Sequence, residues 1–118
     1  MGEFEKHLKL VKEKSRNMER AYKSKDFTVV GDLAIKVIEQ LIEADASLDN
    51  QHLGDHKPRF EWAKKVLPEK LFWKMRKVWF AYGDLGYEGE NGERAKRTIA
   101  FTREIIGFFE NKWRVRIV

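Results

Sequence analysis

The sequence contains no cysteine, only three histidines and no long apolar run. Without cysteine the chain has no disulfide framework and no cysteine-based zinc site, and this composition is typical of the reducing cytoplasm, which we predict as its location. A membrane span needs about 18 or more consecutive apolar residues, and no segment approaches that length. The first residues are charged, so we expect neither an export signal nor a membrane partner.

The composition is that of one folded domain. The chain has 118 residues, which predicts a single helical domain over residues 1–118 with residues 113–118 as an extended tail. Apolar residues make up 42% of the chain and aromatic residues 13%, which is enough for a core. The net charge of +5 is uneven, because residues 26–56 carry seven acidic side chains and one basic one. Such asymmetry either holds helices in register or docks a charged partner.

The spacing of apolar residues predicts an all-α fold. In residues 2–24 the positions of one face are spaced alternately four and three residues apart. This spacing keeps that helix face apolar for about six turns. The positions on this face are Phe4, Leu8, Val11, Ser15, Met18 and Tyr22. A face of this length must be buried against other helices or a second copy of the chain. We therefore predict a mostly antiparallel bundle of four or five helices.

The same spacing recurs in the later segments. A second helix is predicted after Asp26, whose carboxylate suits an N-cap, and its wide apolar face favours contact with several neighbours. Pro58 is expected at the first position of a short third helix, and Pro68 at its end. The fourth helix is expected to end near Gly83, and Asn91 is the candidate cap of the last one.

Two connecting segments and the C-terminal tail complete the chain. Residues 47–57 are polar, and residues 83–92 contain four glycines, so both are predicted to be loops. Residues 113–118 alternate apolar and basic side chains, which is the period of a strand. Six residues do not build a sheet, so the tail lies either in a groove of its own bundle or against a second subunit.

Two sets of side chains have residue types found in metal sites. His52, Asp55 and His56 lie within five residues and offer imidazole and carboxylate ligands. No second cluster completes the first shell, so a solvated loop is the favoured interpretation, and no metal or cofactor is predicted. Glu39 and Glu43 resemble half of a di-iron site, but the Glu-x-x-His motif of such sites is absent. They are predicted to form either a solvated stripe or ion pairs with basic side chains of adjacent helices.

A basic face is predicted on the fourth helix. Lys70, Lys74 and Lys77 follow the i, i+4, i+7 spacing of one helix face. The residues that could widen it are Arg76, Lys64, Lys65, Arg94, Lys96 and Arg97. Phosphate recognition needs such a patch, so nucleic-acid binding is one hypothesis. A solvated face opposite the apolar residues is the favoured alternative, because no known DNA- or RNA-binding motif accompanies the lysines.

Catalytic motifs are not found. The glycine-rich segment lacks the Gly-Lys-Ser/Thr end of a phosphate-binding loop, and its acidic residues would repel phosphate. No serine lies in a Gly-x-Ser-x-Gly turn, and the sequence places no histidine beside a nucleophile. We predict no catalytic residue and no enzyme activity.

Two stretches resemble the HEPN superfamily of small prokaryotic helical bundles. They are residues 31–44, and the final third, where Tyr87 and a Gly-Glu-Asn-Gly segment precede Ala95 and an aliphatic–aromatic helix. Together they cover about two-thirds of the chain. The resemblance implies an all-α bundle that dimerises and, in some members, binds a nucleotidyltransferase. Nuclease members carry an Arg followed a few residues later by a His late in the chain. The last histidine here is His56, so the resemblance implies no such RNase chemistry.

The favoured hypothesis is a non-catalytic binding or assembly module that forms a homodimer. The long apolar face and the apolar tail are the candidate interface. Its residues are Leu8, Val11, Met18, Tyr22, Trp113, Val115 and Ile117. The alternative hypothesis is nucleic-acid binding through the basic face of the fourth helix.

Overall fold

The described chain consists of helices, and the predicted all-α bundle is confirmed. A computed structural model describes residues 2–87 and 92–117, and the side chains of residues 2–80 and 92–117. The helices are α1 (Glu3–Lys23), α2 (Phe27–Ser47), α3 (His56–Val66), α4 (Glu69–Tyr87) and α5 (Gly92–Trp113). The described residues contain no strand. None of their helices is both long and apolar enough to cross a bilayer.

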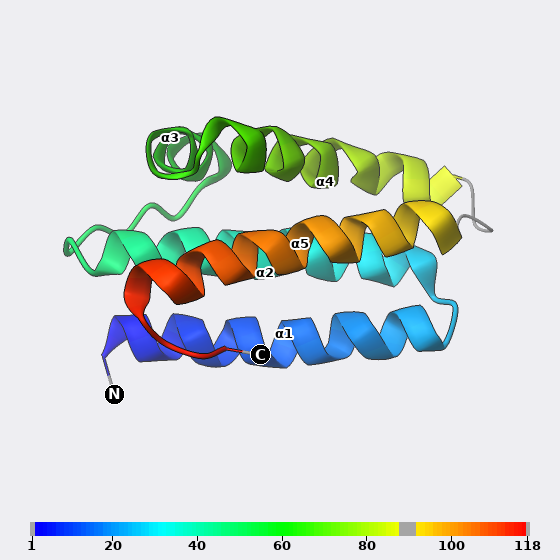
Figure 1. Cartoon of the computed structure of the whole chain (residues 1–118), viewed down its shortest axis with the longest axis horizontal. Coiled ribbons are helices and arrows are strands. Elements are labelled where there is room, and N and C mark those ends of the chain that lie inside the picture. The colour runs from blue at the N-terminus through cyan, green and yellow to red at the C-terminus, as the bar shows by residue number, and fades with distance from the viewer. Residues whose placement is uncertain (1, 88–91, 118) are drawn as a thin grey trace.

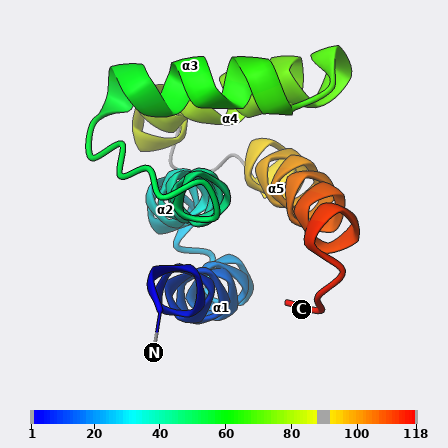
Figure 2. The same ribbon diagram turned by 90° about the vertical axis from the view of Figure 1, so that its left-hand side faces the viewer.

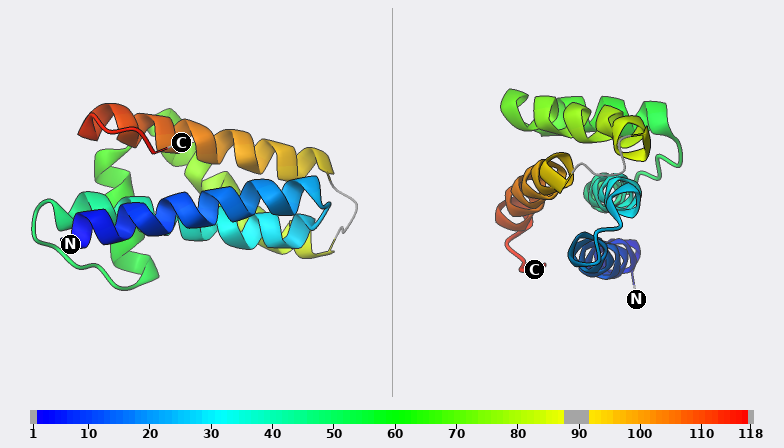
Figure 3. Two further views of the ribbon diagram at one scale, coloured as in Figure 1. Left: turned by 90° about the horizontal axis from the view of Figure 1, so that it is seen from below. Right: turned by 90° about the vertical axis from the view of Figure 1, so that its right-hand side faces the viewer.

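Four of the helices lie along the long axis of the molecule (Figure 1). α2 runs back along α1 after a short turn, α4 lies on the other side of α2, and α5 returns beside both. α3 crosses the bundle at one end, where Figure 2 shows it spanning the top of the molecule. The view from below in Figure 3 shows α1 lying alongside α2.

α2 is the centre of the core, as its wide apolar face predicts. It packs against each of the other four helices. Its buried apolar side chains come from more than one side of the helix because a helix enclosed by several neighbours needs an apolar surface wider than a single stripe. They are Val30, Ala34, Val37, Ile38, Leu41, Ile42, Ala44 and Ala46.

The predicted apolar face of α1 is also confirmed. Val11, Ser15 and Met18 are buried against α2 and α5, and Ala21 joins them one turn later. Phe4 meets the edge of Trp113 at a centroid distance of 5.0 Å, which ties the start of α1 to the end of α5. α1 thus buries its face within its own chain.

Two helix starts differ from the sequence predictions. Asp26 occupies the N-cap position of α2, but its side chain makes no capping hydrogen bond. α3 begins at His56 because the Asp55 carboxylate accepts a hydrogen bond from the His56 N–H at 2.7 Å. Pro58 is therefore the third residue of α3 and not the first. It is still tolerated there, because the first four N–H groups of a helix have no partner within the helix.

The fourth helix is longer than predicted. α4 continues past Gly83 to Tyr87, so part of the predicted glycine-rich loop is helical. Helix-stabilising burial earlier in α4 outweighs the cost of about 1 kcal/mol per glycine. The rest of that loop and the Asn91 cap lie outside the described residues.

The C-terminal tail packs on its own bundle, and its strand-like period is not realised. α5 ends at Trp113, and Arg114 turns the chain with a positive φ of 56°. The Ile117 N–H then donates to the Glu110 carboxylate at 2.6 Å. Ile117 is buried and Val115 packs against the core. Of the two predicted placements, the groove of the same bundle is the one observed.

Candidate functional site

Three charged side chains form a buried network between α2 and α3. Glu39 and Glu43 lie one turn apart on α2, and only 3% and 1% of their surfaces are exposed. Arg59 of α3 bridges them, with its Nη1 donating to Glu39 and its Nε donating to Glu43 at 2.7 Å. The predicted ion pair with a neighbouring helix is therefore found, whereas the alternative of a solvated stripe is wrong. The network fixes α3 across the end of α2.

Glu43 also holds the connection between α2 and α3. Its two carboxylate oxygens accept hydrogen bonds from the N–H groups of Leu53 and Gly54 at 3.0 and 2.8 Å. Burial alone would raise the pKa of Glu43. The hydrogen bond from Arg59, the two backbone donors and the charge of Arg59 together hold the pKa below its ordinary value of 4.5. Glu43 is therefore a charged anchor of the loop at neutral pH.

Glu39 is less completely satisfied. Its Oε1 is buried and has no hydrogen-bond partner among the described residues. Beyond Arg59, the Lys36 ammonium lies 3.9 Å from Oε1 and the His56 Nδ1 lies 3.7 Å from Oε2. Both distances are longer than a hydrogen bond. Glu39 thus depends on Arg59 more than on any other partner.

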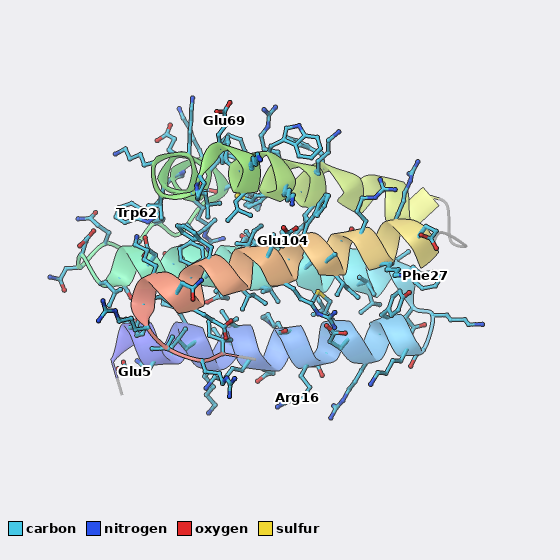
Figure 4. All side chains as sticks on the ribbon, in the orientation of Figure 1. Glu5, Arg16, Phe27, Trp62, Glu69 and Glu104 are labelled. Atoms are coloured by element: carbon cyan, nitrogen blue, oxygen red, sulfur yellow. The ribbon has the colours of Figure 1, made fainter. Side chains whose placement is uncertain are left out.

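A second buried carboxylate joins three helices at the end of α2. Asp45, which is 3% exposed, accepts hydrogen bonds from the indole N–H groups of Trp62 on α3 and Trp113 on α5, at 2.9 and 2.8 Å. The Lys112 ammonium lies 2.9 Å from the same carboxylate and balances its charge. Figure 4 shows Trp62 at the end of the bundle where these helices meet. Each polar group in this junction has a partner, so its role is structural.

The predicted metal candidates do not converge. The Asp55 carboxylate caps α3, and the His56 ring meets the edge of Trp79 at a centroid distance of 5.5 Å. His52 lines a separate hollow together with Glu3 and His7, and His7 is hydrogen-bonded to Gln40 at 2.7 Å. Among residues 2–87 and 92–117, no group of three His, Asp or Glu side chains is placed to hold a metal ion.

An open cleft of about 520 Å³ lies between α4 and α5. Aromatic, cationic, apolar and hydroxyl side chains line it. The lining residues are Trp73, Arg76, Lys77, Val78, Phe80, Arg94, Arg97, Thr98 and Phe101. Four of these nine are cationic and none is acidic, so the cleft attracts negative charge. We call it the α4–α5 cleft.

The spacing of residues along α4 and α5 explains which side chains form each wall of the cleft. Trp73, Lys77 and Phe80 are spaced i, i+4, i+7 on α4, and Arg97 and Phe101 are spaced i, i+4 on α5. Trp73 and Phe101 meet across the cleft at a centroid distance of 6.4 Å. α4 and α5 run in opposite directions, so the later part of α4 lies beside the start of α5 (Figure 1).

Only part of the predicted basic face of α4 lines the cleft. Arg76 and Lys77 line the cleft, whereas Lys74 pairs with Glu104 of α5 at 2.8 Å beside the Phe101 ring. Figure 4 shows Glu104 on the side of α5 that faces α4. Lys70 is exposed and does not line the cleft. The face predicted from lysine spacing is thus replaced by a cleft whose other wall is α5.

The aromatic residues of the cleft were not predicted as site residues. Trp73 and Phe80 fall outside the apolar face of α4, and 52% and 67% of their surfaces are exposed. A large aromatic side chain on the polar side of an amphipathic helix is the sequence signal that identifies both positions.

The predicted dimer-interface residues belong to the core of the single chain. Val11, Met18 and Ile117 are buried. The others are partly buried and pack against that core; they are Leu8, Tyr22, Trp113 and Val115. A second copy reaches the three buried side chains only if the bundle opens, whereas the four partly buried ones are accessible, and the predicted interface stays a prediction.

Comparison of the chain with protein-family models, with curated proteins and with solved structures gives no match.

Proposed function

We propose that this protein is a non-catalytic binding module that binds nucleic acid in the α4–α5 cleft. The observation that carries the proposal is the combination of exposed aromatic rings and cations in one open cleft, with no acidic side chain among its described lining residues. Nucleic acids offer phosphates for the cations and flat bases for the rings. The buried networks at Glu43 and Asp45 join α2, α3 and α5, and none of their residues lines the cleft.

Arg76 and Arg97 are the cations best placed to bind phosphate. They line opposite walls of the cleft, and among the described residues neither has an acidic partner within ion-pair distance. Lys74, in contrast, is held by Glu104. A cation that is not already paired gains more from a phosphate, because no existing ion pair is lost.

The double variant R76E/R97E tests the proposal. With about three phosphates neutralised, the affinity of the wild-type protein for a single strand should fall about 20-fold between about 50 and 200 mM salt. R76E/R97E should lose most of the binding at the lower salt and most of the salt dependence. Fluorescence anisotropy with a labelled oligonucleotide measures both.

The variant K9E/K12E is the matched control. It makes the same change in net charge on exposed positions of α1, on the opposite side of α2 from α4 (Figure 1). It should retain affinity to within about twofold at the higher salt, where long-range charge effects are screened. Equal losses in the two double variants would contradict a specific role of the cleft.

Self-association is the second candidate function. We propose it because Trp73 and Phe80 are large exposed rings of the kind that dominate protein interfaces. The same proposal includes a mostly antiparallel, HEPN-like architecture. It also includes a partner of the nucleotidyltransferase type. This part of the proposal rests on the sequence patterns in residues 31–44 and in the final third of the chain.

Light scattering after size exclusion tests self-association. A mass near twice 14.0 kDa at high concentration, reduced to the monomer by Phe80→Glu, is the expected result. Val29→Glu is the control, because Val29 is an exposed apolar residue on α2 outside the cleft. A monomer at all concentrations would remove this candidate and leave nucleic-acid binding unaffected.

A further inference from the structure

The two exposed rings of the α4–α5 cleft have a regular placement along α4. Trp73 and Phe80 are seven residues apart, which is close to two helical turns, so they lie on one side of α4 about 10 Å apart along its axis. Both rings border the same cleft, and more than half of each surface is exposed. The bundle itself does not bury them.

This spacing matches a stacked single strand. Successive nucleotides in a stacked strand rise about 3.4 Å, so rings about 10 Å apart are separated by three base steps. A strand of about four nucleotides therefore reaches from one ring to the other, which is at the short end of single-strand site sizes. In a duplex the base faces are covered by their neighbours and cannot contact either ring.

The cations are placed to hold the backbone of such a strand. The Lys77 ammonium lies 5.0 Å from the centroid of the Trp73 ring, and Arg97 extends from the facing wall of α5. Lys77 is on a flexible stem, so a base that stacks on Trp73 displaces its ammonium toward the adjoining phosphate. Aromatic and cationic contacts then act on the same nucleotide.

We infer that the α4–α5 cleft binds single-stranded nucleic acid by stacking bases on Trp73 and Phe80 while Arg76, Lys77 and Arg97 contact its phosphates. The inference rests on the proposed nucleic-acid binding and adds the strand state that the cleft selects. Stacking makes binding tolerant of base sequence, because every base presents a flat face.

The test compares two probes and two kinds of variant. The probes are a fluorescein-labelled oligothymidylate of about 12 nucleotides and a duplex of the same length. Trp73→Ala and Phe80→Ala should each weaken single-strand binding about 5- to 100-fold while the salt dependence stays that of the wild-type protein. Trp73→Phe and Phe80→Tyr retain a ring and should recover most of the affinity. Circular dichroism verifies that each variant is folded.

The outcomes separate this inference from the proposed function. Loss of binding in R76E/R97E, with no effect of the alanine variants, would overturn stacking and leave nucleic-acid binding intact. Equal affinity for the duplex would also overturn it. Binding of neither probe by the wild-type protein would remove both proposals. Loss of self-association in Trp73→Ala, with oligonucleotide affinity unchanged, would assign the rings to a protein interface instead.

Discussion

Replacing Arg59 by Met should lower the free energy of unfolding by about 3–5 kcal/mol at neutral pH. Arg59 is the shared partner of Glu39 and Glu43, and both carboxylates are buried. Without the guanidinium, two negative charges lie one turn apart in a region of low dielectric. Met has a similar volume, so the loss measures the missing charge and hydrogen bonds more than a cavity. Urea unfolding followed by circular dichroism gives the value.

The pH dependence of this variant should have the opposite sign to that of the wild-type protein. The folded-state pKa of Glu43 lies below 4.5, so its contribution to stability is complete above that pH. The contribution is lost as the pH falls through the folded-state pKa. In Arg59→Met, burial without a counter-ion raises the pKa of Glu43, and the variant should gain stability as the pH falls from neutral toward that value. Parallel pH profiles of the two proteins would contradict the assigned network.

Lys74→Met is the matched control for Arg59→Met. It also removes a cation from an interhelical ion pair, but the Lys74 and Glu104 side chains are 27% and 47% exposed. Exposed pairs contribute about 0–1 kcal/mol, so this change should be small. A loss as large as that of Arg59→Met would show that burial does not govern the difference.

Replacing Asp45 by Ala should cost about 3 kcal/mol. The substitution removes the acceptor of two indole N–H groups and the counter-ion of Lys112. A buried donor left without an acceptor costs about 1–3 kcal/mol, and the two losses share one site, so they do not add fully. Because Trp62 and Trp113 both lose their acceptor, the tryptophan fluorescence should change together with the stability.

Two further variants sharpen the test of Asp45. Asp45→Asn keeps one carbonyl oxygen, so one indole retains its acceptor and the loss should be intermediate. Asp49→Ala removes an exposed carboxylate one turn beyond Asp45 and should change the stability by no more than about 0.5 kcal/mol. If Asp49→Ala were as costly as Asp45→Ala, the effect would reflect general charge in this acidic segment and not the junction.

The candidate sites show how far residue spacing reaches. Glu39 and Glu43 are i and i+4, so the sequence predicts that they share a helix face. It does not identify Arg59 as their partner, because the chain has many basic residues and the pairs are 20 and 16 positions apart. Hydropathy alone assigns carboxylates to the surface. These two are nevertheless buried among apolar residues, because they are paired with Arg59.

Residue spacing also predicts only part of the α4–α5 cleft. The spacing of Lys70, Lys74 and Lys77 predicts a basic face on the fourth helix, and Lys77 does line the cleft. Lys74 is instead paired with Glu104, which lies 30 positions later on α5. Trp73 and Phe80 are exposed because none of the described helices covers that side of α4.

The apolar period of the sequence by itself determined the helices and the central place of α2. A helix must bury an apolar face whichever helix covers it, so its pattern is visible without knowledge of the partner. The tertiary structure alone decided which charges meet, where the tail packs and which aromatic rings stay exposed. These depend on distances between residues far apart in the chain, and the strength of an ion pair changes steeply with distance and burial. The burial of Val11, Met18 and Ile117 within the bundle was open in the sequence for the same reason, since an apolar face does not specify whether its own chain or another buries it.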